Sequence, residues 1–400
     1  MQVITLSYTL GSRKERGDVY MKAYYRILGI LFGIIVFGFF AASFILPKKT
    51  FSDLENRVLS QVPSFSYDTL IEGRYTSKIE SYINDHFPLR SNFVTLKSSV
   101  DGILGKVENN GVYLGKDGYL LEEIQKPNEK HMNDNIEAIN SFIEKHKDLN
   151  SSFLLVPNAA TVLNDYLPKN AISEDGLKYI NEFGSQLDSK IKFINPYDKL
   201  NEHKDEYIFY KTDHHWTTLG AYYGYEKYCE ENEIKNKSLN EYEKVMVSSN
   251  FYGTLFSKTL SKRESGDEIN VYIPKDENDE TVVEYVTEKE KSPSMYSSEY
   301  LEKRDKYGMF LKGNHPVVKI STTAKLEKER KLLLIKDSYA NSFVPFLTSH
   351  FSEITLIDPR YYYDDIESLM EQDKYTDILF LYNANTFFQD NSLSGVLNNN

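Results

Sequence analysis

Residues Leu332-Leu-Leu-Ile-Lys-Asp-Ser338 are the most informative part of this sequence about its fold. Four consecutive apolar residues, Leu332–Ile335, are typical of a short strand that is buried on both faces, as strands of a covered parallel sheet are. The strand leads directly into Ser338, and the pattern predicts a helix over 340–350. A serine at a strand-to-helix turn lies at the carboxyl end of a parallel strand, where open α/β sheets place their sites.

Short apolar runs on both sides of this stretch repeat the same pattern. The predicted strands are 153–157, 191–194, 354–357 and 378–382, and the predicted helices between them are 133–148, 175–190 and 364–372. Strands that alternate with helices form a parallel sheet with helices on its faces. We therefore predict an α/β fold.

The segment 235–330 interrupts this alternation. It is rich in Lys, Glu, Asp and Ser, and its strand-like pieces are Val271–Ile273 and Val282–Val286. We expect a β-rich insertion or a mobile flap.

The N-terminal part of the chain contains an uncharged apolar run, residues 27–46. Twenty such residues in a helix span about 30 Å, the thickness of the hydrocarbon core of a bilayer. Residues 1–26 carry five basic and two acidic side chains, and the positive-inside rule places such a tail in the cytoplasm. We predict an uncleaved signal anchor at the cell membrane, a linker and helical stalk over 47–108, and an extracellular domain over 109–393. The alternative is a cleaved signal peptide with Ala41-Ala-Ser43 at its cleavage site.

The composition excludes several classes of protein. The 400 residues carry a formal net charge of −12, which argues against a basic nucleic-acid-binding surface. The single cysteine, Cys229, excludes an intrachain disulfide and a thiolate metal cluster. Because residues 1–26 carry a net charge of +3, the remainder carries −15, and this acidic bulk belongs to the predicted outer part.

The densest polar cluster is Thr212-Asp-His-His-Trp-Thr217. An acid two residues before a histidine can reach its Nδ1 in an extended or tightly turned segment, because period 2 places both on one side. Asp213 and His215 have this spacing, so Asp213 would fix the tautomer and leave Nε2 as a base, while His214 would point the other way. The alternatives are a structural His–Asp pair or a surface metal site. Adjacent histidines lack the ligand spacing of a zinc site, and we predict neither a metal nor another cofactor.

Ser338 is the candidate nucleophile. The N–H groups of the helix predicted after it would stabilise an oxyanion. The alternative is that Ser338 or Asp337 simply caps that helix. A poised serine combined with the Asp213–His215 pair favours a Ser-His-Asp triad.

Four further residues are predicted to stabilise the oxyanion or to bind substrate. Tyr339 follows the nucleophile, and Asn383 and Arg360 follow the ends of two other predicted strands. Asn314 lies in the predicted insertion. The alternative roles are a turn residue for Asn383 and Asn314 and a surface ion pair for Arg360.

The Thr212–Thr217 block resembles the signature of the bacterial DHHW proteins, which are similar to the alginate O-acetylation proteins and the wider SGNH hydrolase-like acyltransferases. Further pieces of the resemblance are Glu55-Asn-Arg57 followed by Pro63, Asp85-His-Phe-Pro-Leu-Arg90, Asn110-Gly-Val-Tyr-Leu-Gly115, and Lys336 to Tyr339. The resemblance implies an SGNH-like, flavodoxin-like sheet that is circularly permuted, since the Asp/His block precedes the serine. It carries the triad onto Asp213, His215 and Ser338, with Lys336 standing where a glycine commonly precedes the Asp-Ser pair.

The resemblance also implies a function. We expect a membrane-anchored O-acyltransferase, above all an O-acetyltransferase, that modifies a polysaccharide of the bacterial cell envelope through an acyl-enzyme. Acetyl-CoA is cytoplasmic, so the resemblance implies a multi-pass membrane acyltransferase as the partner that supplies the acyl group. One alternative is a carbohydrate esterase with the same triad. The other is a non-catalytic surface protein that binds glycan.

Overall fold

The computed structural model describes residues 2–261, 265–275, 280–323, 326 and 328–398. The remaining positions, several of them in the predicted insertion, lie outside the described residues. The chain divides into two compact units, Met1–Asp53 with Arg57–Leu96, and Leu54–Asn56 with Lys97–Asn400.

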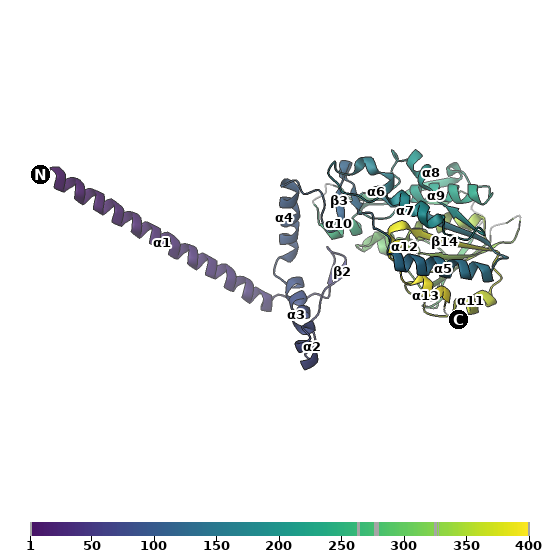
Figure 1. Ribbon diagram of the computed structural model, residues 1–400, viewed down its shortest axis with the longest axis horizontal. Helices are drawn as coiled ribbons and strands as arrows, with labels where there is room; N and C mark the ends of the chain where they lie inside the picture. Colours follow the sequence, from purple (N-terminus) through teal and green to yellow (C-terminus); the bar gives the residue numbers. More distant parts are fainter. Residues whose placement is uncertain (1, 262–264, 276–279, 324–325, 327, 399–400) are drawn as a thin grey trace. The chain divides into compact units, whose positions relative to one another are not determined.

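The first unit begins with the long helix α1 (Gln2–Ile45), drawn in purple in Figure 1. Its part Met21–Ile45 is long and apolar enough to cross a membrane, which agrees with the predicted apolar helix. The predicted stalk contains helices, and Gly73, with a φ of +75°, separates the first two of them. The elements after α1 are β1 (Phe51–Ser52), β2 (Arg57–Val58), α2 (Tyr67–Ile71), α3 (Arg74–Asp85) and α4 (Arg90–Ile103).

Among the described residues, the second unit is built on an eight-stranded sheet with the order β10-β9-β11-β13-β12-β14-β5-β6. The last five strands in this order are mutually parallel, which confirms the predicted parallel α/β core. Their bounds are β5 (Asn150–Val156), β6 (Ile191–Ile194), β12 (Lys331–Lys336), β13 (Glu353–Ile357) and β14 (Asp377–Asn383). The last strand of the chain, β14, therefore lies between β12 and the first of the five, β5.

Helices cover both faces of the sheet (Figure 1). Leu154 and Val156 of β5 point into a core layer that includes residues of α9, while Phe153 and Leu155 point into the opposite layer. This alternation is why the central strands read as continuous apolar runs. The helices of the second layer are α5 (Glu129–Lys145), α7 (Gly176–Gly184), α11 (Ile366–Gln372), α12 (Ala384–Gln389) and α13 (Leu393–Asn398); those of the first layer include α6 (Ala159–Val162), α8 (Tyr197–Glu202) and α9 (Thr218–Glu231).

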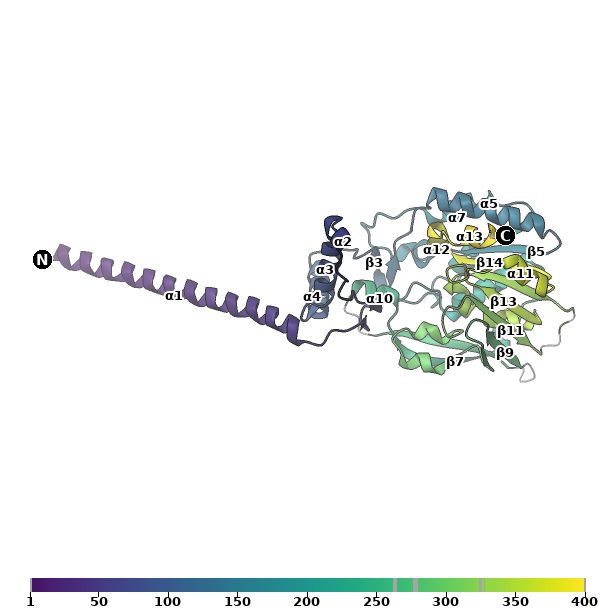
Figure 2. The same cartoon turned by 90° about the horizontal axis from the view of Figure 1, so that it is seen from below.

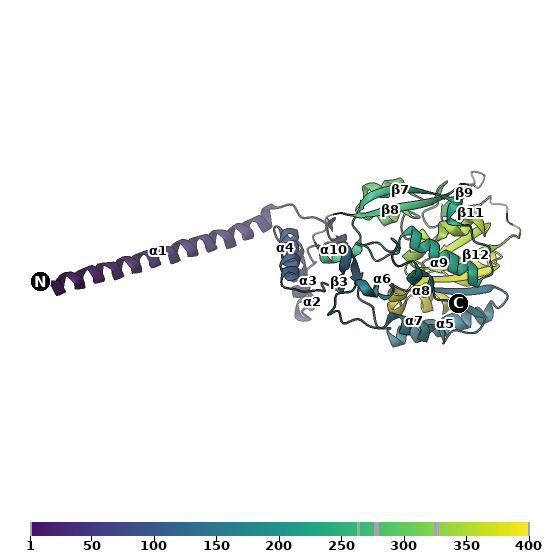
Figure 3. The same ribbon diagram turned by 90° about the horizontal axis from the view of Figure 1, so that it is seen from above.

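The segment 235–330 is rich in strands, but three of its five described strands belong to the main sheet. β9 (Thr281–Tyr285), β10 (Glu290–Ser292) and β11 (Val317–Thr322) extend the sheet beyond β13 in antiparallel pairing (Figure 2). β7 (Tyr242–Phe251) and β8 (Asp267–Pro274) form a separate two-stranded ribbon (Figure 3). A second small hairpin, β3 (Val112–Leu114) with β4 (Leu120–Glu122), precedes α5.

The chain after Ser338 differs from the prediction. In place of a helix over 340–350 it forms two short 3₁₀ segments, η6 (Ser338–Ser342) and η7 (Val344–Ser349). Pro345 explains the break, because it has no N–H to donate to the carbonyl of Asn341 in an α-helix. The predicted helix N-terminus behind Ser338 is therefore a single tight turn.

Candidate active site

A buried carboxylate shapes the turn that carries Ser338. Asp337 caps η6, as one of the sequence alternatives held, and its Oδ1 accepts a hydrogen bond from the Tyr339 N–H at 2.8 Å. Its Oδ2 accepts from the backbone N–H of Asn383, also at 2.8 Å. These two bonds tie the end of β12 to the end of the neighbouring strand β14. The Ser338 side chain takes no part in the cap.

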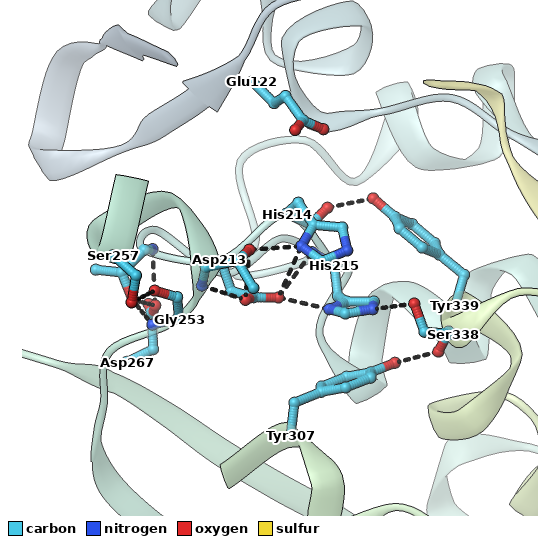
Figure 4. A network of polar contacts seen from close by, with 12 residues as sticks. Glu122, Asp213, His214, His215, Gly253, Ser257, Asp267, Tyr307, Ser338 and Tyr339 are labelled. Carbon is cyan, nitrogen blue, oxygen red and sulfur yellow. Dashed lines mark hydrogen bonds and ion pairs between the residues drawn. The ribbon is translucent and has the colours of Figure 1, made fainter. Parts of the chain in front are cut away.

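Ser338, His215 and Asp213 form one chain of hydrogen bonds (Figure 4). The Ser338 Oγ lies 2.8 Å from His215 Nε2, and His215 Nδ1 lies 2.5 Å from Asp213 Oδ1. The backbone N–H of His215 donates to the same carboxylate oxygen at 3.0 Å. The histidine and the aspartate are both buried. This is the order of groups that an activated serine nucleophile requires.

The second oxygen of Asp213 is held by the start of α10 (Thr254–Thr259). Asp213 Oδ2 accepts hydrogen bonds from the Thr254 N–H at 2.8 Å and from Thr254 Oγ1 at 3.1 Å. Gly253 permits this approach, because a Cβ there would lie 2.2 Å from the Asp213 Cβ. Both carboxylate oxygens of Asp213 are thus fixed in place.

A third buried carboxylate, Asp267 at the start of β8, holds the segment that leads to Asp213. The N–H groups of Lys211 and Thr212 each donate to it at 2.8 Å. The Thr212 Oγ1 and the Tyr207 hydroxyl each donate at 2.5 Å. Four donors on one buried group satisfy it fully and make the loop before His215 rigid.

His214 does not point away from His215, so this part of the prediction is wrong. The two rings lie side by side, with centroids 3.9 Å apart, and His214 Nδ1 is 2.7 Å from Thr254 Oγ1. The loop is bent rather than extended at these residues, so the alternation of side chains along a strand does not apply.

The surroundings keep His215 neutral and Asp213 ionised. Burial and the adjacent His214 lower the pKa of His215 from 6.5 to about 4, although Asp213 opposes the shift. Burial by itself would raise the pKa of Asp213, but His214, His215 and the Thr254 N–H hold that pKa well below its usual range. A neutral imidazole beside an ionised carboxylate is ready to accept a proton at Nε2.

Comparison with known proteins identifies the family of this chain. The model of the DHHW protein family matches residues 129–357, more than half of the chain. The chain belongs to the DHHW family. No curated protein sequence matches it.

Solved structures share the fold of this DHHW protein. The crystal structure of a DHHW family protein from Eubacterium siraeum matches with a TM-score of 0.64 and 27% identity, covering 73% of this chain and 97% of that chain. Bacillus cereus PatB1 with a sulfonyl adduct matches with a TM-score of 0.61 and 20% identity, covering 71% and 97%. The O-acetyltransferase domain of Pseudomonas putida AlgJ matches more distantly, with a TM-score of 0.43 and 14% identity over 71% and 94%.

Tyr339 and Asn383 of the DHHW protein are committed to structural hydrogen bonds. The Tyr339 N–H donates to Asp337, and its hydroxyl donates to the His214 carbonyl. The Asn383 side chain donates to the Val156 carbonyl at 3.2 Å and accepts from a backbone N–H at 3.1 Å, capping α12. These bonds occupy the Tyr339 N–H and hydroxyl and one N–H of the Asn383 amide, and they give Asn383 the capping role that was its alternative. An oxyanion or substrate-binding role for the two residues stays a prediction.

Asn314, which is exposed, and Arg360, which is half-buried, contact the buried pair of Lys336 and Asp358 beside the serine turn. The Arg360 guanidinium donates to both carboxylate oxygens of Asp358, at 2.8 and 2.6 Å. Lys336 Nζ lies 3.4 Å from Asp358 Oδ2 and donates to Asn314 Oδ1 at 3.2 Å. Asn341 Oδ1 accepts from the same Nζ at 2.9 Å. Lys336, which stands where the resemblance expects a glycine, thus has its charge paired inside the protein.

Burial and ion pairing shift the pKa values of Lys336 and Asp358 in this network. Burial lowers the pKa of Lys336, and Asp358 counteracts part of that effect. Burial by itself would raise the pKa of Asp358, but Lys336 and Arg360 hold it below its usual range.

The atoms that could bind a metal in the metal-site alternative already form hydrogen bonds within the protein. Asp213, His214 and His215 offer ligand atoms within 4.8 Å of one another. However, both ring nitrogens of His215 face Asp213 and Ser338, and His214 Nδ1 faces Thr254. A metal would have to replace these bonds.

Several residues of the site carried no sequence signal. Tyr307, Gly253, Thr254 and Asp267 all come from the segment interpreted as an insertion or flap. Tyr307 stacks on His215, and its hydroxyl donates to the Ser338 carbonyl at 3.0 Å and accepts from Ser342 Oγ at 3.2 Å. A glycine such as Gly253 permits close backbone approach, but the segment also contains Gly266, Gly308 and Gly313, so the sequence does not single out this position.

Proposed function

We propose that this DHHW protein is a membrane-anchored O-acyltransferase, specifically an O-acetyltransferase, that modifies a polysaccharide outside the cytoplasm. The observation that carries the proposal is the hydrogen-bond chain from Ser338 through His215 to Asp213. Membership of the DHHW family supports it. The catalytic roles of the three residues are part of the proposal.

In the first half of the reaction, Ser338 Oγ attacks the carbonyl carbon of an acyl donor while its proton moves to His215 Nε2. Asp213 stabilises the resulting imidazolium through Nδ1. The tetrahedral intermediate collapses when the leaving group takes the proton from His215, which leaves an acyl ester on Ser338. We assign the backbone N–H of Ser338 to the oxyanion, because the Tyr339 N–H is engaged by Asp337.

In the second half, a sugar hydroxyl replaces the donor. His215 Nε2 accepts the hydroxyl proton while the sugar oxygen attacks the acyl carbon. Collapse breaks the bond to Ser338 Oγ, which regains its proton from His215. The products are an O-acylated sugar and the free enzyme. Transfer to water by the same steps would make the protein an esterase.

The proposal extends to topology. Residues 27–46 anchor the chain in the membrane, residues 1–26 remain in the cytoplasm, and the SGNH-like domain works outside. The apolar helix and the basic tail support this orientation. Since acetyl-CoA is cytoplasmic, a multi-pass membrane acyltransferase supplies the acyl group. We also interpret the central position of β14 beside β5 as the permuted order of an SGNH-like sheet.

The test uses the full chain in detergent with p-nitrophenyl acetate, with and without an oligosaccharide acceptor. Intact-mass spectrometry should find an acetyl group on the protein, and Ser338→Ala should abolish it. His215→Ala should remove the activity, and His214→Ala should reduce it far less. Ser349→Ala is the matched serine control, since Ser349 Oγ only bonds to the Phe346 carbonyl within η7.

Each alternative has its own outcome. Acetate release without acetylated sugar would identify an esterase. If no acetyl group is found on Ser338, both enzyme functions are excluded and the non-catalytic glycan-binding protein is the remaining alternative. Equal losses from both histidine variants would favour a metal site or a structural role for the pair.

A further inference from the structure

A cavity of about 600 Å³ opens at the carboxyl edge of the sheet, in the range of small-molecule sites. One wall comes from the loop after β13, and the other comes from α12 and the loop after it. Its lining includes Arg360, Tyr363, Thr386, Gln389, Asp390 and Asn391. Because β12 lies between β13 and β14, these walls flank the strand that ends at the Ser338 turn.

Asp390 brings an unsatisfied acceptor to this cavity. The residue is buried, with 7% of its surface exposed. Oδ1 accepts hydrogen bonds from the Ser392 N–H at 2.8 Å and from Ser392 Oγ at 2.6 Å. Oδ2 is buried without a hydrogen-bond partner among the described residues. A buried acceptor of this kind is costly unless a donor reaches it, and Asp390 is one of the residues that line the cavity.

Arg360 brings donors to the opposite wall. Two of its nitrogens bind Asp358, whose charge therefore balances the guanidinium. Tyr363, 82% exposed, adds an aromatic ring at the rim, and its hydroxyl donates to the Arg360 carbonyl at 3.2 Å. An acceptor, a donor and an aromatic face in one hollow suit a ligand that is polyhydroxylated and uncharged. An anion would meet Asp390, and a cation would meet Arg360.

A chain of side-chain contacts connects the cavity wall to the strand that carries the proposed nucleophile. Arg360 binds Asp358, Asp358 binds Lys336, and Lys336 is the last residue of β12, two residues before Ser338. A ligand in the cavity would therefore lie at the same edge of the sheet as the serine.

We propose that this cavity binds a neutral sugar residue of the acceptor glycan, with a sugar hydroxyl donating to Asp390 Oδ2. The inference rests on the proposed function, because it names the acceptor subsite of the same enzyme. It assigns Asp390, Arg360 and Tyr363 to binding rather than to chemistry.

Binding is measured separately from turnover. The full chain carrying Ser338→Ala is titrated calorimetrically with cello-, xylo- and chito-oligosaccharides and with de-O-acetylated fragments of the native envelope glycan. Asp390→Asn and Tyr363→Ala are then added singly to that parent. Each should weaken binding about ten-fold or more, as expected for a lost buried hydrogen bond or ring contact. Tyr67→Ala, at an exposed tyrosine of α2, is the matched control and should bind as the parent does.

Turnover distinguishes this inference from the proposed function. In the chain with Ser338 intact, Asp390→Asn should raise the acceptor KM about ten-fold, more than it slows formation of the acyl-enzyme. If Asp390→Asn forms the acyl-enzyme normally and its acceptor KM is unchanged, the proposed subsite is wrong. The proposed transferase function would still stand. If glycan binding depends on Asp390 but no acyl-enzyme forms, the subsite stands and the proposed transferase function is wrong. If no glycan in the set binds the Ser338→Ala parent, the subsite is wrong. Thermal unfolding of Asp390→Asn checks that the Ser392 cap survives.

Discussion

Tyr307 lies flat against His215, with ring centroids 3.7 Å apart and ring planes 12° apart. It comes from η5 (Lys306–Met309), far from His215 in the sequence. Its hydroxyl holds the Ser338 carbonyl at 3.0 Å. One side chain thus covers a face of the proposed base and fixes the turn of the proposed nucleophile.

Substitutions of Tyr307 should separate these two roles. Tyr307→Phe keeps the ring over His215 and loses hydrogen bonds to Ser338 and Ser342, so the acylation rate should fall about three- to ten-fold. Tyr307→Ala also admits water to the imidazole, and we expect a loss of about 100-fold. Stopped-flow release of p-nitrophenol measures both rates. Equal rates for wild type and Tyr307→Ala would contradict a role for the ring.

The pH dependence of acylation should reflect the lowered pKa of His215. The reaction needs the neutral imidazole, so the rate is retained above the pKa and lost as the pH falls through about 4. An unperturbed histidine would instead lose activity near pH 6.5. Tyr307→Ala, which exposes the ring, should move the midpoint upward. A wild-type midpoint near 6.5 would mean that burial does not control this base.

Gly253→Ala should disable the site through Asp213. The added Cβ would lie 2.2 Å from the Asp213 Cβ and 2.3 Å from its Oδ2, so the carboxylate must shift away from His215. Loss of the orienting acid costs up to about 10⁴-fold in known serine triads, and we expect at least about 100-fold here. Acylation rates of purified variants test this.

Gly395→Ala is the control for that variant. A Cβ at Gly395 in α13 meets nothing within 4 Å, and the residue is helical. The activity should be unchanged, and the free energy of unfolding should rise by about 0.5–1 kcal/mol. If both glycine variants lose activity equally, the steric argument at Gly253 fails.

The three charged residues Lys336, Asp358 and Arg360 should contribute unequally to stability. Asp358→Ala leaves two cations without their shared partner and should lower the free energy of unfolding by about 3–5 kcal/mol. Lys336→Met leaves Asp358 bound to Arg360 and should cost less, about 1–3 kcal/mol. Urea unfolding followed by fluorescence of Trp216, the single buried tryptophan, measures both. A larger cost for Lys336→Met would contradict this order.

The sequence predicted the features that depend on local patterns. Apolar runs such as Leu332–Ile335 identified the parallel strands, because a strand buried on both faces has no polar alternation. The spacing of Asp213 and His215 predicted their pairing, which the hydrogen bond between them matches. The orientation of His214 was missed, because it depends on a bent loop held by Asp267.

The sequence therefore specifies local features: the apolar N-terminal helix, the strands and the serine at the end of one of them. Which distant residues meet depends on the packing of the whole chain. Ser338 and His215 are separated by 123 positions, and their hydrogen bond exists because β12 and the loop before α9 meet at one edge of the sheet. Tyr307, Gly253 and Asp267 join them through long-range packing, which leaves no periodic trace along the chain. The charges of Lys336 and Asp358 likewise became a buried pair only when β12 and β13 came side by side, where burial makes pairing necessary.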